Sequence, residues 1–253
     1  MLQTMIEKGA VTRSPGALAG TSNLLDFCVK TAERRLSDKS RYAALDRKHL
    51  INLLDKEDLL SSEVFFEFAL QERLVSVISK YLRAIPILTD IQLWWSSQNS
   101  TLTGSQQFHF DQEDLSTVRV FLNVSDVTER AGPLTYFDKQ QSRTIRAKVP
   151  NWLRRIDDSL IRDLDLEKDA ATLTGPPGTI SIIDTAKCCH MGSRNNQEDR
   201  LVLMLHFTPF HSIKEGFSYL VADVLEDDRW PLSKLAHQRW LNLVVPKSQP
   251  SFV

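Results

Sequence analysis

The sequence has no long apolar segment and no excess of one charge. No apolar run approaches the roughly 18 residues that a membrane-spanning helix needs, and the N-terminus MLQTMIEKGAVTRSPG lacks the continuous apolar stretch of a secretory signal. The 31 Lys and Arg residues nearly cancel the 32 Asp and Glu residues, so no net field attracts nucleic acid or an anionic membrane. We therefore expect a cytoplasmic protein whose partner is a small molecule.

Cysteine is also scarce. There are three cysteines, Cys28, Cys188 and Cys189, and an odd number with an adjacent pair that is poorly placed to bridge fits a reducing compartment. No CxxC spacing is present, which argues against a zinc site built on cysteine. The position of Cys188 and Cys189 beside His190 does not by itself bring a thiolate to a metal.

The length of 253 residues is enough for one domain with one substantial core. We divide it into a helical N-terminal layer over about 1–86, a β-rich core over about 87–209 and a C-terminal extension over 210–253. The first twenty residues, with Ser14, Pro15, Gly16 and Gly20, are typical of a mobile or loosely packed lead-in. Helices are predicted from a cap at Ser22 or Asn23 to Leu36, from Asp46 through Leu50, Leu53 and Leu54, over 62–82 with Pro86 ending it, and over about 231–243.

From residue 87 the pattern changes to short runs rich in β-branched and aromatic residues, which predict strands over 87–96, 106–111, 117–125, 133–137, 179–185 and 200–208. Few helix-length segments separate these runs, so an antiparallel sandwich or barrel is favoured over alternating strands and helices. The interruption over 139–175, with a charged helical stretch near 151–169, is too long for a hairpin turn. It is the best candidate for a lid or a substrate-specific insert.

The strongest local signal for chemistry is the segment Gln-Phe-His109-Phe-Asp111. Alternate residues of a strand share a face, so His109 and Asp111 can bind one ion together. A later glycine-led strand runs on to His190. If the two strands lie side by side, two imidazoles and one carboxylate surround one side of a metal and leave positions open for a chelating cosubstrate and O2 on Fe(II).

An HxD tripeptide alone arises often by chance, but the residues downstream strengthen it. Arg200 begins the largely apolar run RLVLMLHF, ten residues after His190. The planar guanidinium of an arginine at the start of an inner strand can hold a carboxylate through two charge-assisted hydrogen bonds. The distal carboxylate of 2-oxoglutarate needs such a partner.

Together these features resemble the phytanoyl-CoA dioxygenase family of Fe(II)/2-oxoglutarate oxygenases. The resemblance extends over about 65–209 and rests on the helix ending in Tyr81-Leu82, the HxD, the strand VRVFLNVSDV with the following AGPL, the strand leading to His190, and Arg200. It implies a double-stranded β-helix, that is, a cupin-like jelly roll, with N-terminal helices and a helical insert. It also implies hydroxylation of a small substrate with conversion of 2-oxoglutarate to succinate. The implied roles are iron ligands for His109, Asp111 and His190, and contacts to 2-oxoglutarate for Arg200 and Ser193.

Several other residues are candidates for supporting roles. Strand alternation places Arg119, Phe121 and Asn123 on one face and the valines and leucine between them on the other. Arg119 and Asn123 are therefore candidate cosubstrate contacts, although Arg119 could instead form a structural ion pair. Gln92 and His206 are weaker candidates of the same kind. Of Trp94 and Trp95, at most one is expected to line the pocket.

Two questions about substrate and activity stay open in the sequence. The basic side chains over 143–155 could attract an anionic substrate, or they could form a solvated helix face. A cupin-type isomerase or lyase and a catalytically silent jelly-roll binding protein are alternative functions. Arg200 argues against the first alternative, and the complete ligand set argues against the second. Because Asp111 is not Ala or Gly, hydroxylation is favoured over halogenation.

Overall fold

The computed structural model describes residues 1–38, 42, 49–150, 153–212 and 224. Its main element is a six-stranded antiparallel sheet in the order β1-β7-β4-β9-β3-β2. The strands are β1 (Ala10–Arg13), β2 (Ile51–Asn52), β3 (Pro86–Ser96), β4 (Val118–Asn123), β7 (Ile180–Asp184) and β9 (Arg200–Pro209). The long strands agree with the runs predicted from the sequence.

A second antiparallel sheet has three short strands, in the order β6-β5-β8. They are β5 (Thr135–Tyr136), β6 (Ala171–Thr172) and β8 (His190–Met191). The predicted strand over 106–111 is wrong as a regular strand, because it consists of the 3-10 helix η2 (Gly104–Gln106) followed by isolated bridges. Phe108 pairs with Ile156 and His109 pairs with His190, so this segment still extends the small sheet locally.

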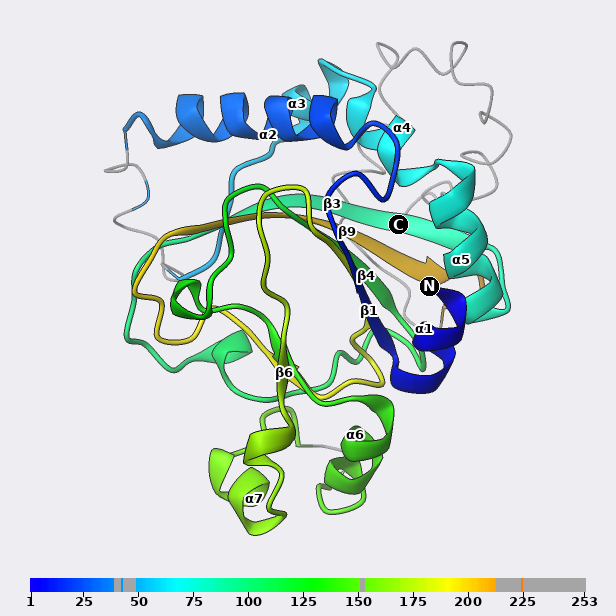
Figure 1. Cartoon of the computed structure of the whole chain (residues 1–253), viewed down its shortest axis with the longest axis vertical. Helices are drawn as coiled ribbons and strands as arrows, with labels where there is room; N and C mark the ends of the chain where they lie inside the picture. The colour runs from blue at the N-terminus through cyan, green and yellow to red at the C-terminus, as the bar shows by residue number, and fades with distance from the viewer. Residues whose placement is uncertain (39–41, 43–48, 151–152, 213–223, 225–253) are drawn as a thin grey trace, which may run out of the picture.

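Helices cover one face of the large sheet, and α6 and α7 lie on the opposite side of the molecule (Figure 1). The covering helices are α1 (Leu2–Lys8), α2 (Thr21–Leu36), α3 (Lys56–Leu60), α4 (Val64–Ala69) and α5 (Glu72–Leu82). The core between them and the sheet contains Val118, Val120 and Leu122 of β4, as the strand alternation predicted. Antiparallel sheets with flanking helices fit a jelly-roll fold. None of the helices in the described residues combines the length and apolar character that a membrane crossing requires.

The helix predicted over 62–82 is broken into α4 and α5 at Leu70 and Gln71. At 3.6 residues per turn, Leu74 and Ile78 would point away from the side of a single helix that carries Phe65 and Ala69. All four side chains are buried. The break therefore turns both apolar faces toward one core. The periodicity within either half shows where its own apolar face lies but not how the two halves are oriented to each other. Helix α5 ends at Leu82, before Pro86.

Three other predictions for the N-terminal region are wrong. The first residues are not a loose lead-in, because Met5 of α1 is fully buried and β1 pairs with β7. Helix α2 begins after Gly20, without a side-chain cap, in place of Ser22 or Asn23. The helix predicted through Leu53 and Leu54 is wrong in its described part, because residues 51–52 form the edge strand β2 and residues 53–54 are not helical. There the Asn52 side chain accepts hydrogen bonds from the Leu93 and Leu54 amides. Asp46 and the helix predicted over 231–243 lie outside the described residues.

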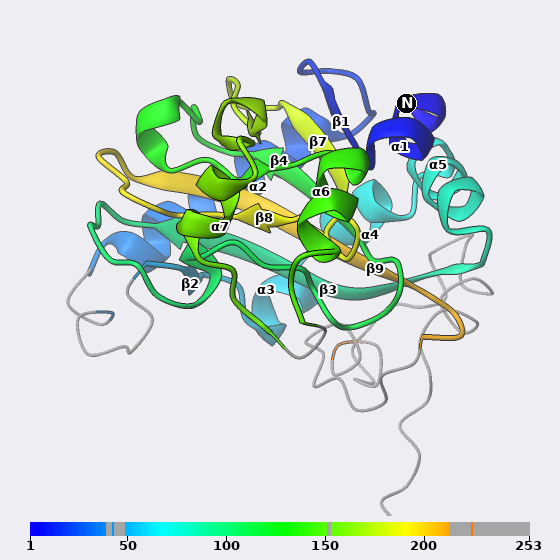
Figure 2. The ribbon, with the colours of Figure 1, turned by 90° about the horizontal axis from the view of Figure 1, so that it is seen from below.

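The segment after β5 contains α6 (Lys139–Arg146), α7 (Asp158–Asp163) and the 3-10 helix η4 (Glu167–Asp169). Figure 2 shows α6 and α7 on the near side of β8, with β7, β4, β9 and β3 behind it. The two helices share a separate hydrophobic cluster that includes Ile145, Ile161 and Phe108. This part of the chain thus packs against the segment that carries the HxD.

Candidate metal centre

Two histidines and one aspartate from distant parts of the sequence converge between the two sheets. One potential ligand atom from each of His109, Asp111 and His190 lies within 4.8 Å of the others. Nε2 of His109 and Nε2 of His190 are 3.7 Å and 3.9 Å from Oδ1 of Asp111. Reciprocal backbone hydrogen bonds of 2.9 Å between His109 and His190 hold the two imidazoles side by side.

The imidazole orientations are set by backbone carbonyls. Nδ1 of His109 lies 2.8 Å from the Gln107 carbonyl, and Nδ1 of His190 lies 2.9 Å from the Cys188 carbonyl. Donation from Nδ1 to a carbonyl leaves the Nε2 lone pair free to bind a metal. Both Nε2 atoms face the Asp111 carboxylate, so the centre presents two nitrogens and one oxygen toward the same point.

The protonation states of the three residues suit metal binding. Burial, together with the neighbouring His190, lowers the pKa of His109 to about 3. Burial also lowers the pKa of His190. For Asp111, burial opposes ionisation, but the charge of Arg119 and the favourable interaction with the two imidazoles outweigh it and hold the pKa well below its usual range. Neutral imidazoles and an ionised carboxylate are the forms that bind a divalent cation without first losing protons.

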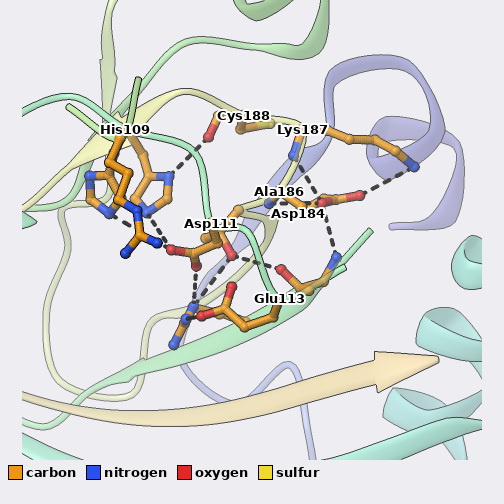
Figure 3. A network of polar contacts seen from close by, with 12 residues as sticks. His109, Asp111, Glu113, Asp184, Ala186, Lys187 and Cys188 are labelled. Atoms are coloured by element: carbon orange, nitrogen blue, oxygen red, sulfur yellow. Dashed lines mark hydrogen bonds and ion pairs between the residues drawn. The ribbon is translucent and has the colours of Figure 1, made fainter. Parts of the chain in front are cut away.

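Arg119 positions the carboxylate of Asp111. Its Nε donates a 2.7 Å hydrogen bond to Oδ2 of Asp111, and its Nη2 is 3.5 Å from Glu113 (Figure 3). This hydrogen bond engages Oδ2, so Oδ1 remains available on the side of the carboxylate that faces the imidazoles. Arg119 lines the cavity as expected for a pocket residue, but in this structure its charge is paired with Asp111 and Glu113.

Asp184 organises the turn that leads to His190 (Figure 3). Its fully buried carboxylate accepts hydrogen bonds from the Tyr81 hydroxyl at 2.7 Å and the Ser116 hydroxyl at 2.5 Å. The Ala186 and Lys187 amides also donate to it, each at 3.1 Å. In the same turn, the Thr185 carbonyl accepts from the Asp111 amide at 3.0 Å. The carboxylate therefore sets the path of both metal-binding segments.

We expect Asp184→Asn to lower the free energy of unfolding by about 2–3 kcal/mol, because the amide cannot accept all four hydrogen bonds and carries no charge. Urea denaturation of the full chain measures this change. The matched control is Asp163→Asn on exposed α7, which should change stability by less than about 0.5 kcal/mol. Equal effects of the two substitutions would contradict the role assigned to Asp184.

Arg200 lies at the other end of the same cavity and is buried without an acidic partner among the described residues. Its guanidinium donates to the Gly132 carbonyl at 2.7 Å and to the Ser193 hydroxyl at 2.5 Å, with the Ser96 hydroxyl at 3.4 Å. Burial lowers the pKa of Arg200 to about 10, which leaves it charged at neutral pH. A buried cation with only neutral partners is costly unless an anion binds to it.

One cavity of about 180 Å³ is lined by the three predicted iron ligands and the four main candidate cosubstrate contacts: His109, Asp111, Arg119, Asn123, His190, Ser193 and Arg200. The Asn123 amide donates to the Gly175 carbonyl at 2.9 Å. Trp94 lines the cavity while Trp95 is buried in the opposite core, as alternation predicted. Sequence reasoning missed Ser96, although its place two residues after Trp94 on the same face could have indicated it.

Four weaker candidates lie outside the cavity lining. His206 shares a face with Arg200, as predicted, and lies opposite Arg119 and Asp90 in the sheet. Its buried Nε2 has no hydrogen-bond partner in the described part of the chain, and a role for His206 stays a prediction, as it does for Gln92. Burial raises the pKa of Cys188 and raises that of Cys189 to about 12, so both remain thiols. Neither belongs to the ligand cluster.

Helices α6 and α7 of the 139–175 segment pack against the side of the HxD segment that faces away from the cavity, so they do not form the lid considered from the sequence, whereas Leu173 of the same segment lines the cavity. No residue of α6 or α7 lines the cavity. Phe110, between the two ligands, lies 3.8 Å beneath the Arg146 guanidinium, and the Ile156 amide donates to the Phe108 carbonyl at 2.8 Å. Arg194 connects the turn after His190 to α7 through two hydrogen bonds to Asp158, at 2.8 Å and 3.2 Å.

Comparison with known proteins finds similarity in structure alone. No protein-family model and no curated protein matches the sequence. The chain is similar to EctD from S. alaskensis, solved with 2-oxoglutarate and 5-hydroxyectoine (15% identity, 85% of this chain and 77% of that one, TM-score 0.57). It is also similar to HygX from Streptomyces hygroscopicus with nickel and 2-oxoglutarate (17%, 82% and 85%, 0.56). A third similar structure is SnoN, a non-heme alpha ketoglutarate dependent epimerase from nogalamycin biosynthesis (12%, 86% and 84%, 0.51). At these identities the likeness shows a shared fold.

Proposed function

We propose that this protein is an Fe(II)- and 2-oxoglutarate-dependent dioxygenase that hydroxylates a small organic substrate. The observation that carries the proposal is the pairing, in one cavity, of a two-histidine, one-carboxylate cluster with a buried arginine that has no acidic partner in the part of the chain that the structure describes. Enzymes of similar fold were solved with 2-oxoglutarate, and with iron or nickel. We assign the core to the double-stranded β-helix type and the chain to the neighbourhood of the phytanoyl-CoA dioxygenases.

The residues present fit a ferrous ion. Nε2 of His109, Nε2 of His190 and Oδ1 of Asp111 would occupy one face of the ion and leave the remaining positions for other ligands. The carbonyls of Gln107 and Cys188 keep both imidazoles oriented, and Arg119 stabilises the ionised form of Asp111.

The residues also fit 2-oxoglutarate. The Arg200 guanidinium would bind its distal carboxylate, and the Ser193 and Ser96 hydroxyls beside it would add hydrogen bonds. Asn123 lines the same wall. When bound, iron and 2-oxoglutarate supply the oxidising chemistry, in which O2 is consumed, 2-oxoglutarate becomes succinate and CO2, and a substrate C–H bond is oxidised. The protein binds and orients these groups and keeps water away from them.

Two alternatives differ from this proposal in chemistry. A cupin-type isomerase or lyase would need the metal but has no evident use for an unpaired buried arginine, and a binding module would not need three aligned ligands. Epimerisation remains within the same cofactor chemistry, since SnoN is described as an alpha ketoglutarate dependent epimerase. The identity of the product separates hydroxylation from epimerisation.

Anaerobic titration of the metal-free protein with Fe(II) and 2-oxoglutarate tests the proposal. We expect a weak visible charge-transfer band only when both are present, because chelation of the ion by the 2-oxo acid produces it. The control is succinate in place of 2-oxoglutarate, which has both carboxylates but no 2-oxo group and should give no band. Folded protein that shows no band with both components would overturn the proposal.

A further inference from the structure

We propose that the substrate is uncharged and presents an apolar group to the metal centre, and that Trp94 is the main specificity-determining contact. This inference rests on the proposed function and names its substrate class. It differs from the anionic substrate that the sequence left open. Three features of the cavity support it: the pairing of its charged side chains, its apolar lining, and two hydrogen-bond donors without an acceptor among the described residues.

The charged side chains of the cavity leave no partner for a charged substrate. Three titratable lining residues form the ligand cluster. The Arg119 charge is balanced by Asp111 at 2.7 Å and Glu113 at 3.5 Å. Arg200 has only neutral partners, and one carboxylate of the cosubstrate would neutralise it. A second anion in the cavity would therefore be buried without a counterion, which is strongly unfavourable.

The uncharged part of the lining is mostly apolar. Val202 and Met204 of β9 and Phe121 of β4 form the floor between the two arginines, because alternate residues of these paired strands face the cavity. Leu134 before β5, Leu173 after β6 and Trp94 of β3 add further apolar surface to the lining. In the proposed function 2-oxoglutarate would occupy part of this cavity of about 180 Å³, between the metal ligands and Arg200, so the space left for the substrate suits a small apolar group.

Trp94 offers a large face and a free donor to a ligand. It lies opposite Val202 in the β3–β9 pairing, and its side chain is only half-buried, in contrast to Trp95 in the core. Within the described residues its indole N–H has no hydrogen-bond acceptor, and the Ser105 hydroxyl, which also lines the cavity, has no partner there either. Two neutral donors beside an apolar surface suit a substrate with an apolar body and a hydroxyl or carbonyl group.

The basic side chains of the 139–175 segment do not supply an anion site in this cavity. Arg143 is exposed on α6, and Arg146 stacks on Phe110 and donates to the Ala186 carbonyl at 2.7 Å. Arg155 is exposed, and its charge contributes to the lowered pKa values of His109 and His190. None of the three lines the cavity. Arg155 is the cation among these three whose charge acts on the two metal-binding histidines, so a charged probe belongs in the test.

Paramagnetic relaxation tests the proposal with a matched pair of probes. The full chain is loaded with Mn(II), which accepts the same oxygen and nitrogen ligands as Fe(II), and saturated with 2-oxoglutarate. Proton relaxation is then measured for benzyl alcohol and for benzoate, which share one ring and differ in charge. We expect benzyl alcohol to bind near the ion at least about tenfold more tightly than benzoate.

Trp94→Ala should weaken benzyl alcohol binding by about tenfold or more, because a large buried contact is lost. Leu115→Ala is the control, since Leu115 is an exposed apolar residue outside the cavity. Tighter or equal binding of benzoate, binding of neither probe, or unchanged affinity in Trp94→Ala would each overturn the inference. Relaxation of the 2-oxoglutarate protons in the same samples tests the proposed function separately. If Mn(II) did not enhance this relaxation, metal and cosubstrate would not share the cavity, whatever the probes do.

Discussion

Replacing Asp111 with alanine is expected to remove Fe(II) binding and all oxidation of 2-oxoglutarate. The substitution deletes the only anionic ligand of the cluster and leaves the buried Arg119 beside two imidazoles without the carboxylate that it contacts at 2.7 Å. Loss of an outer partner of a metal site typically costs 10–100-fold in affinity. Loss of a direct ligand together with its charge should exceed that range.

Anaerobic calorimetry with Fe(II), followed by the visible band with 2-oxoglutarate, measures this effect. Circular dichroism establishes that the variant is folded, and Asp111→Asn provides a second variant of similar shape without the charge. The control is Asp126→Ala, an exposed aspartate that should leave iron affinity unchanged. Iron affinity in folded Asp111→Ala within a few fold of the parent would show that the metal, if it binds, does so elsewhere.

The second large effect is expected at Arg200. Arg200→Met keeps a long side chain but removes both charge-assisted hydrogen bonds to a carboxylate, each worth about 1.5–3 kcal/mol. The affinity for 2-oxoglutarate should therefore fall by about 100-fold or more. Iron binding should change little, because Arg200 contacts Gly132, Ser193 and Ser96 but none of the three ligands.

Titration of the band with 2-oxoglutarate at saturating Fe(II) measures the loss. Arg200→Lys should recover part of the affinity, since the charge is retained without the planar two-donor geometry. Arg130→Met is the surface control, because Arg130 is exposed and pairs with Glu198 at 3.0 Å. Parallel losses of iron and 2-oxoglutarate in Arg200→Met would mean that the anchor for the cosubstrate is a different residue.

The helices of the 139–175 segment pack elsewhere than a lid would, although Leu173 of the same segment lines the cavity. The segment's length and charge indicated an insertion between strands, and an insertion in an enzyme often closes over a ligand. The deciding feature is Phe108 and Phe110, whose alternation with His109 and Asp111 sends two aromatic rings away from the cavity. Ile156 and Arg146 contact that side. The insertion is therefore needed to bury the back of the metal-binding segment.

Local pattern was sufficient where neighbouring residues decide the outcome. The alternation of β4 assigned Arg119 and Asn123 to the cavity and Val118 and Val120 to the core, and the same period separated Trp94 from Trp95. Local pattern gave wrong predictions where two segments pack in the same core. The break between α4 and α5 and the burial of α1 depend on surfaces contributed by other parts of the chain, which periodicity within one segment does not contain.

The sequence by itself determined the ligand types, the shared face of His109 and Asp111, and the strand that presents Arg200, because each follows from residue chemistry and a two-residue repeat. Only the tertiary structure decided that His190 pairs with His109, that Arg119 holds Asp111 and that Asp184 fixes the turn leading to His190. It also decided that Arg200 contacts neutral groups and no acidic side chain among the described residues. These relations join segments far apart in the chain. Their energies depend on distance and burial, which exist only after the sheets and helices have packed.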